Sequence, residues 1–310
     1  MDEEILRKYL EAGRIARIVL QETVKLVEPG ARLLDICDYA ERRTRELGGE
    51  PAFPCNISVN DVAAHYTPVI GDDATIPEDA IVKIDIGVHV DGYIADTAVT
   101  VDLSGKHEKL LEAAREALEA AIREVKPGVS FQTIGAVVER LIKSKGFKPI
   151  ANLSGHSLGR YLVHAGESIP NVNEPLPGVF RPGNAYAIEP FATTGEGYVV
   201  EREPITIYSL NPERPSMRAM RLRQLEKRLL SEIATRFRTL PFTERWFDVE
   251  KYGGVEALRL ALRKLWRARA LIGYPMLVER SGGLVAQFEH TVLVLEDRII
   301  VTTGGDEGEA

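Results

Sequence analysis

Two aspartates in neighbouring apolar segments are the residues best placed to do chemistry. Asp85 lies in VKIDIGVHV and Asp96 in YIADTAV, and the dipeptide Asp91-Gly92 between them reads as the tight turn of a β-hairpin. In that register Gly87 pairs with Asp96, so Asp85 and Asp96 project from one face of the hairpin as diagonal neighbours. Two carboxylates held together on apolar strands repel each other and lose their hydration. We therefore expect a metal ion, or a pair of ions, between them, unless a longer loop turns one aspartate towards solvent.

Two glutamates repeat this anomaly further along the chain. Glu189 in AYAIEPFAT and Glu289 in LVAQFEHTVLVL are lone acids inside predicted apolar strands, where an unpaired charge is expensive. Either glutamate alone could face solvent. Four such acids in one chain argue against a solvated strand face for all of them. His156 in SGHSLGRY offers a nitrogen ligand. A set of four carboxylates and one imidazole suits Mn, Fe or Co better than a structural zinc site, which prefers thiolates and histidines.

Three of the six histidines lie in segments that read as loops. His65, His156 and His164 are surrounded by glycine, alanine and serine, and functional groups concentrate in loops. Taken singly, each of them is more often structural than catalytic. His290 follows Glu289 directly, so it should point to the opposite face of its strand.

The elements that must position these residues read as an α+β body. Helical periodicity predicts helices over residues 3–27, 33–47, 106–125 and 131–145. Extended segments are predicted over residues 51–68, 81–88, 93–101, 149–153, 185–192, 199–208, 284–295 and 298–302. A weak internal repeat relates the segment from Pro77 to Asp85 to the segment from Pro182 to Glu189. It suggests two similar halves that each bring an acid and a histidine to one centre.

A basic segment with helical periodicity interrupts this body. Residues 212–270 hold 15 Lys and Arg against 7 Asp and Glu, a local charge of +8 that leaves −15 on the rest of a chain whose net charge is −7. We predict a helical insertion from Asn211 to about Gly273. Its charge could steer the molecule towards a polyanion such as ribosomal RNA. Alternatively it is a solvated face whose arginine stems pack on the body, and we favour this interpretation.

Composition limits the function classes. The 310 residues are 45% hydrophobic and 27% charged, which is typical of a globular protein. No apolar stretch approaches the ~20 residues that cross a bilayer, and acids stand where a signal peptide would have its basic region. Two cysteines exclude a disulfide framework, and the net charge argues against a general nucleic-acid binder. We expect a cytoplasmic, monomeric enzyme with no DNA or membrane partner.

Four motifs resemble those of a known family. The segments VKIDIGVHVDGYIADTAVTV, SGHSLGRYLVHAG, YAIEPFAT and AQFEHTVLV occur in an order and spacing similar to those of the methionine aminopeptidases. The helical insertion between the last two motifs resembles the type II branch, close to its archaeal members. The resemblance covers essentially the whole chain. It implies the pita-bread fold, with two pseudo-symmetric halves around a curved antiparallel sheet. Residues 1–310 would form a single catalytic domain that contains an insertion subdomain at 211–273.

The resemblance also implies roles for individual residues. Two divalent ions (Co, Mn, Fe or Zn) would be held by five ligands: Asp85 on one ion, His156 and Glu189 on the other, and Asp96 and Glu289 as bridges. His65 and His164 would be catalytic histidines that bind substrate but no metal. Six further positions would form the methionine side-chain pocket: Phe53, Pro54, Asn56, Val163, Tyr274 and Met276.

The implied reaction is the removal of the N-terminal methionine from nascent polypeptides. An activated water would attack the first peptide carbonyl, with Glu189 as the proton shuttle and His164 donating to the carbonyl oxygen. His65 would hydrogen-bond near the scissile nitrogen.

Two other functions are possible on the same fold. An Xaa-Pro aminopeptidase or prolidase would share the ligands, but such relatives usually carry a large additional N-terminal domain. A non-catalytic RNA- or ribosome-associated module would have lost ligands, whereas all five are present here.

Overall fold

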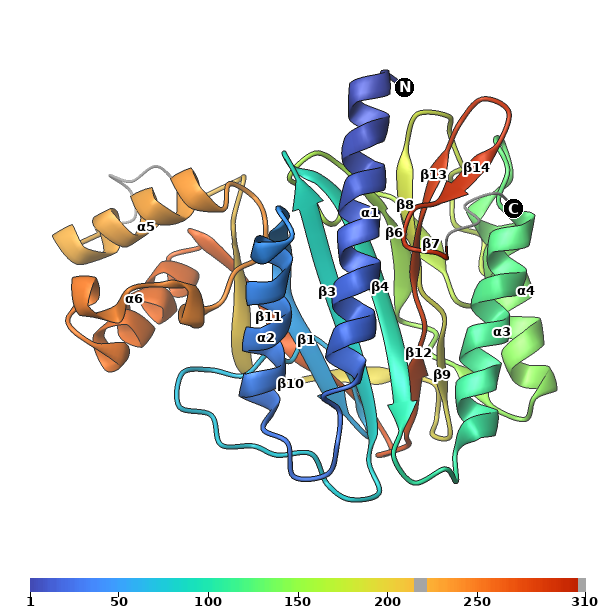
Figure 1. The fold of residues 1–310 in the computed structure, drawn as a ribbon, viewed down its shortest axis with the longest axis horizontal. Helices are drawn as coiled ribbons and strands as arrows, with labels where there is room; N and C mark the ends of the chain where they lie inside the picture. Colours follow the sequence, from blue (N-terminus) through green and yellow to red (C-terminus); the bar gives the residue numbers. More distant parts are fainter. Residues whose placement is uncertain (215–221, 306–310) are drawn as a thin grey trace.

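The N-terminal half is an antiparallel sheet covered by two helices. The computed structural model describes residues 1–214 and 222–305. Strands β1 (Glu50–Val59), β3 (Ile81–Val90) and β4 (Tyr93–Asp102) pair in the order β1-β3-β4. Helices α1 (Glu3–Val24) and α2 (Leu33–Glu46) lie side by side across one face of this sheet (Figure 1). Their apolar stripes bury against the sheet and form one hydrophobic core.

The second half has a similar layered arrangement. Its larger sheet has the order β14-β13-β8-β6-β7, with β14 (Ile299–Val301), β13 (His290–Val294), β8 (Ala185–Ile188), β6 (Ser154–Leu158) and β7 (Ser168–Pro170). A smaller sheet pairs β12 (Val285–Gln287), β9 (Phe191–Thr193) and β5 (Lys148–Pro149). Helices α3 (Glu108–Glu124) and α4 (Phe131–Ser144) pack on these strands and form a second core. The predicted α+β body with two similar halves is confirmed, since each half is a sheet under a helix pair (Figure 1).

The halves meet where β4 runs beside the C-terminal strands. The backbone amide of Asp96 donates to Thr291 Oγ1 at 2.7 Å, and Thr97 Oγ1 donates to the carbonyl of Glu289 at 2.8 Å. Ala98 forms an isolated antiparallel bridge with Glu289. These bonds join residues almost two hundred positions apart, and they fix Asp96 and Glu289 next to each other.

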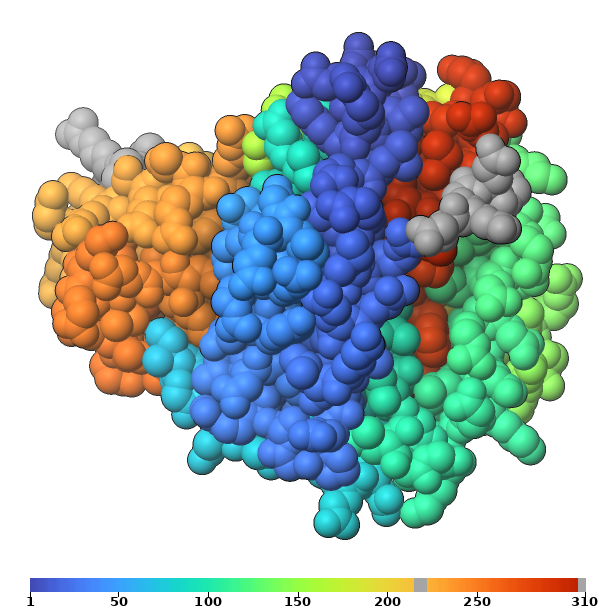
Figure 2. Space-filling view, viewed as in Figure 1, coloured from blue at the N-terminus to red at the C-terminus, as the bar shows by residue number. Residues whose placement is uncertain are grey.

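The helical insertion lies between two long paired strands at one side of the molecule. Strands β10 (Val199–Leu210) and β11 (Leu271–Glu279) form a sheet with β2 (Val62–Ala64). The connection between β10 and β11 contains α5 (Gln224–Arg236), the 3₁₀ turns η1 (Glu244–Trp246) and η2 (Val249–Tyr252), and α6 (Val255–Arg267). These elements have a core of their own and form the orange lobe of Figure 2. Residues 215–221 of the predicted insertion lie outside the described residues, and Gly273 lies inside β11 opposite Tyr208.

Four predicted extended segments are interrupted or displaced. The segment 51–68 breaks at the turn of Asn60 and Asp61 between β1 and β2, and β2 ends at Ala64. The strand predicted over 149–153 is only β5, and the next strand, β6, carries His156, which was expected in a loop. The segment 185–192 breaks at Glu189-Pro190 because proline has no amide to donate to a ladder. The segment 284–295 breaks between β12 and β13. Both glutamates therefore lie at strand ends, where their side chains can turn into the site. No helix in the described ranges is long and apolar enough to span a membrane.

Candidate metal centre

The predicted hairpin register is confirmed. Gly87 pairs with Asp96 and Asp85 pairs with Ala98, so the two aspartates are diagonal neighbours on one face of β3 and β4. Turn residues Asp91 and Gly92 adopt φ values of 51° and 87°, the left-handed conformation that a two-residue hairpin turn requires. The local sequence of the hairpin thus sets the relative placement of two of the carboxyl groups.

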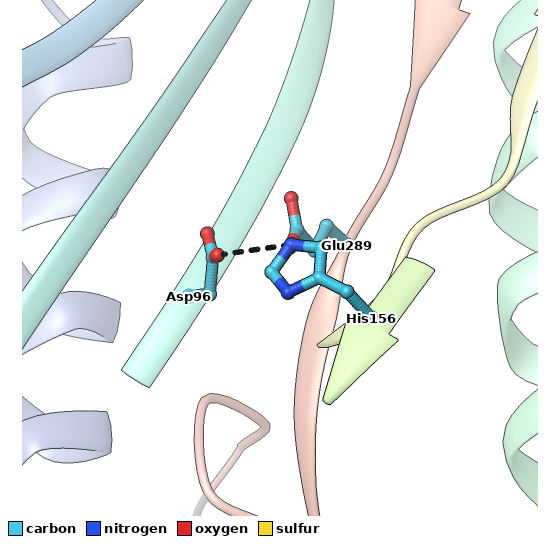
Figure 3. Close-up of side chains that lie close together, drawn as sticks. All are labelled: Asp96, His156 and Glu289. Carbon is cyan, nitrogen blue, oxygen red and sulfur yellow. Dashed lines mark ion pairs between the residues drawn. The ribbon is translucent and has the colours of Figure 1, made fainter. Parts of the chain in front are cut away.

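Three elements bring three possible ligands together. Asp96 on β4, His156 on β6 and Glu289 between β12 and β13 each offer a ligand atom, and these atoms lie within 4.8 Å of one another. Their side chains converge on one point between the strands (Figure 3). The Nε2 atom of His156 lies 3.8 Å from Asp96 Oδ2 and 3.4 Å from Glu189 Oε1. Glu189 therefore joins the same group.

The carboxyl groups are buried without compensating charge. Desolvation raises the pKa of Asp85, Glu189 and Glu289 well above their usual ranges, and it raises the pKa of Asp96 to about 7. Repulsion among these carboxylates adds to the shift at Asp85, Glu189 and Glu289. Lys83, which is buried on the same strand β3, does not supply this charge in the hydrogen bonds observed. Its Nζ donates to the backbone carbonyls of Asn60 and Val285.

The centre has the donor set of a divalent metal site. Among the described residues, buried side-chain atoms without a hydrogen-bond partner include Asp85 Oδ1, Asp96 Oδ1, His156 Nδ1 and Glu289 Oε1. Orphaned buried acceptors of this kind are rare in proteins and call for an occupant. Carboxylate oxygens with one imidazole suit a divalent cation such as Mn, Fe or Co. The residues present therefore fit a bound metal.

One member of the centre was not predicted from the sequence. Gln287 Nε2 donates to Glu289 Oε2 at 3.1 Å and lies 3.4 Å from Glu189 Oε2. Its amide thus orients both glutamates, and it leaves Glu289 Oε1 without a partner among the described residues. The sequence feature that could have indicated Gln287 is its position two residues before Glu289. This spacing places both side chains on one face of an extended segment.

A cavity of about 360 Å³ opens onto this centre. It is lined by all five predicted ligands, by His65 and His164, and by four of the six predicted pocket residues, namely Phe53, Asn56, Val163 and Tyr274. Two predicted pocket residues are not among its lining: Pro54 accepts a hydrogen bond from Asn56 Nδ2, and Met276 lies on β11 opposite Arg202. Lining residues that the sequence did not indicate include Ala64, Asn152, Leu153, Phe191, Ile207 and Pro241.

Phe53 forms an apolar wall of the cavity because its strand partner is a glycine. A Cβ atom on Gly87 would lie 2.2 Å from Phe53 Cε1. Only glycine at this position therefore allows the Phe53 ring to lie against the backbone of β3. This contact fixes the ring beside Asp96, the residue that Gly87 faces on its other side.

The two histidines without a predicted metal both line the cavity. Desolvation, with a smaller contribution from His164, lowers the pKa of His65 to about 4, and desolvation lowers the pKa of His164. Both rings are therefore neutral at pH 7 and carry one N–H donor each. The His65 ring packs edge-on against Tyr274 at 5.6 Å, and the His164 ring lies 4.4 Å from that of His156.

Comparison with known proteins places this geometry in a family. Residues 7–296 match the model of metallopeptidase family M24. The chain is 50% identical over 298 residues to a methionine aminopeptidase of Pyrococcus horikoshii, covering 96% of this chain and 98% of the relative.

Solved structures show the same fold at low sequence identity. A methionine aminopeptidase from Thermotoga maritima superimposes with a TM-score of 0.70 at 23% identity, covering 98% of both chains. A thermophilic Arx1 superimposes with a TM-score of 0.86 at 19% identity, covering 98% of this chain and 92% of the other. With its pita-bread fold and a buried donor set that fits a metal, this chain belongs to metallopeptidase family M24.

Proposed function

We propose that this protein is a metalloaminopeptidase that removes the N-terminal methionine from nascent proteins and peptides. The observation that carries the proposal is the buried centre of four carboxyl groups and one imidazole at the base of a cavity of about 360 Å³. The curated relatives that match nearly the full length, at 43–50% identity, are methionine aminopeptidases.

We assign the five ligands as the family resemblance implies. Asp85 would hold one ion, His156 and Glu189 the other, and Asp96 and Glu289 would bridge the pair. The orphaned oxygens of Asp85, Asp96 and Glu289 support this assignment. When two divalent ions are bound there, they supply a water whose pKa is lowered towards ~7 as the nucleophile.

Proton transfer, hydrogen bonding to the substrate and positioning are assigned to individual residues of the chain. A carboxylate oxygen of Glu189 takes the proton from the attacking water and delivers it to the leaving amine, as a general base and then a general acid. His164, neutral because desolvation lowers its pKa, donates its ring N–H to the carbonyl oxygen as negative charge develops there. His65 hydrogen-bonds near the scissile nitrogen. Gln287 keeps the carboxylate of Glu189 in place.

The apolar part of the cavity selects the side chain. Phe53, Val163 and Tyr274 line it and leave room for an unbranched apolar chain of methionine size. Pro54 and Met276 were assigned to the same pocket, and we propose for them a supporting place behind the lining residues. Asn56 is oriented by the Pro54 carbonyl, which agrees with that arrangement.

One digestion separates this function from its alternatives. Chelated protein is reloaded with Mn, Co or Fe and incubated with Met-Gly-type and Xaa-Pro-type peptides, and the products are identified by mass spectrometry. Loss of methionine from Met-Gly peptides alone supports the proposal. Cleavage of Xaa-Pro peptides instead identifies a prolidase-like enzyme, and no cleavage with any metal identifies a binding module.

The basic insertion raises a separate question about partners. Several of its described basic side chains are paired with acids: Arg245 with Glu41, Arg259 with Glu244, and Lys264 with Glu226. This pairing favours the interpretation that the basic side chains stabilise the fold over the interpretation that they bind the ribosome transiently. We expect no salt-sensitive co-sedimentation with ribosomes, and co-sedimentation that salt abolishes would support the contact. The proposed substrates are nascent chains, which places the protein in the cytoplasm.

A further inference from the structure

A buried arginine of the insertion contacts the segment that follows His65. Arg245, on η1, is only 5% exposed. Its Nε donates to the carbonyl of Pro68 at 2.8 Å, and its Nη2 donates to Thr67 Oγ1 at 2.9 Å. Thr67 and Pro68 are two and three residues from His65, so the guanidinium binds the segment that follows this histidine.

The same guanidinium is anchored on the opposite side by helix α2. Both of its terminal nitrogens bind Glu41, at 2.7 and 2.9 Å, in a fork-to-fork pair. Glu41, also 5% exposed, further accepts from Trp246 Nε1 at 2.6 Å and from the backbone amide of Cys55 at 3.1 Å. Since Cys55 lies between the pocket residues Pro54 and Asn56, one ion pair links the insertion, the pocket strand and the His65 segment.

A second ion pair holds the far end of that segment. Glu244, next to Arg245, accepts from the amide of Ile70 at 3.0 Å, and Arg259 of α6 donates to the Ile70 carbonyl at 2.9 Å. Arg259 and Glu244 are themselves paired at 2.6 Å. Residues 67–70 are therefore fixed by the insertion at both ends.

His65 needs such support because its own backbone is strained. Its φ is 65°, a left-handed conformation that a non-glycine residue adopts at an energetic cost and keeps only where the surroundings impose it. Its Nδ1 has no hydrogen-bond partner among the described residues, and the ring is contacted from β11 by the Pro275 backbone and the Tyr274 ring. The position of the ring thus depends on these contacts and on the backbone that carries it.

We propose that Arg245 is a positioning residue, which holds residues 67 and 68 so that the imidazole of His65 projects into the cavity. The inference rests on the proposed function for the role of His65 in catalysis. It gives the helical insertion a part in the reaction, since the insertion supplies the group that places a candidate catalytic histidine.

The test uses the whole protein and a conservative substitution. Arg245→Lys keeps the charge opposite Glu41, but a single ammonium does not span Glu41, Thr67 and Pro68 together. Arg280→Lys is the matched control, because Arg280 also pairs with one glutamate, Glu196, but on the surface. Thr67→Val is the second variant, which removes one accepting hydroxyl and no charge, should Arg245→Lys fail to fold.

Two measurements report on the positioning. In protein labelled at its six histidines, the ring signals of His65, identified by their loss in His65→Ala, should shift in Arg245→Lys and in Thr67→Val but not in Arg280→Lys. With a Met-Gly peptide, kcat of Arg245→Lys should fall by up to about 10²-fold, the cost of misplacing a reacting group by ~1 Å. Added to His65→Ala, the same substitution should change kcat by less than about twofold, because the two residues act as one unit.

The outcomes are distinct. Unshifted His65 signals, or an equal loss of kcat with and without His65, would overturn the positioning role and leave Arg245 as a structural brace. Wild-type protein that does not release methionine would contradict the proposed function instead, and the ring signals would still report whether Arg245 places His65.

Discussion

The ionisable residues of the centre are all removed from solvent. Four carboxyl groups and one imidazole are buried together, and burial favours their neutral forms. Asp96 is the most connected of them, since it shares a face with Asp85 and also approaches His156 and Glu289. A divalent cation would remove the repulsion and satisfy the orphaned oxygens at once.

Replacing Asp96 should therefore disable the centre. Asp96→Asn keeps the shape but removes the charge of a ligand assigned to both ions, so we expect loss of metal binding and of activity. Titration calorimetry with Mn²⁺ and peptide hydrolysis by reloaded protein measure the two effects. Asp79→Asn is the control, because its side chain is 73% exposed and its ion-pair partner among the described residues is Lys106. Full activity of metal-free Asp96→Asn would falsify the dinuclear assignment.

The two histidines eight positions apart should respond differently to alanine. His164→Ala should keep both metals while kcat falls by roughly 10²–10³, the cost of losing one donor to a developing oxyanion. His156→Ala should lose affinity for one ion, and added metal should partly restore its activity. Calorimetric titration of both variants decides between the roles. If His164→Ala loses a metal and His156→Ala keeps both, the two assignments are exchanged.

Among the elements, the turn that follows β11 is organised by one buried carboxylate. Glu279, at the end of β11, accepts hydrogen bonds from the backbone amides of Glu196, Ser281 and Gly283, at 2.7, 2.7 and 2.9 Å. Burial alone would raise the pKa of Glu279, but the bonds from Ser281 and these amides outweigh it and lower the pKa to about 2. A Cβ on Gly195 would lie 2.3 Å from this carboxylate, which explains the glycine there.

This carboxylate predicts a pH-dependent contribution to stability. Because its pKa falls on folding from 4.5 to about 2, the stabilisation is complete above pH 4.5 and disappears as the pH falls towards 2. Glu279→Gln should therefore lower the free energy of unfolding by roughly 2–3 kcal/mol at pH 7, and by much less near pH 2. Calorimetric unfolding at several pH values measures the difference from wild type. Glu201→Gln, at an exposed position on β10, is the control, and a Glu279→Gln defect that is independent of pH would contradict the linkage.

For the whole molecule, composition and ion pairing together predict heat resistance. The chain has only 7 Asn and 4 Gln in 310 residues. The buried pair Arg245–Glu41 ties the insertion to the body, and the Arg259–Glu244 pair within the insertion binds the backbone of Ile70. Such networks gain in value at high temperature, because the cost of desolvating charged groups falls. We expect an unfolding midpoint above about 80 °C, with ~90 °C as the mark of a hyperstable protein. A calorimetric transition near ~55 °C, ordinary for a mesophile domain, would contradict this expectation.

Local sequence was enough to predict the parts of the site that depend on neighbours along the chain. The turn at Asp91-Gly92 sets the hairpin register, and the register places Asp85 beside Asp96. Helical periodicity and local charge likewise predict an insertion over residues 211–273, and the described helices of that stretch lie between β10 and β11. The family resemblance then supplied the remaining ligand candidates, which local pattern alone left open.

The contacts between residues far apart in the sequence are set by the packing of the whole chain. Glu289 reaches Asp96 because β13 docks beside β4, and Arg245 reaches Glu41 across 204 positions of sequence. Pro54 and Met276 do not line the cavity, while Ile207 does, because the strand bulges and packing that turn a side chain inwards are set by the facing layer. Local pattern fixes the alternation along a strand, whereas the partner across a sheet or a domain boundary is selected by the packing of the complete chain.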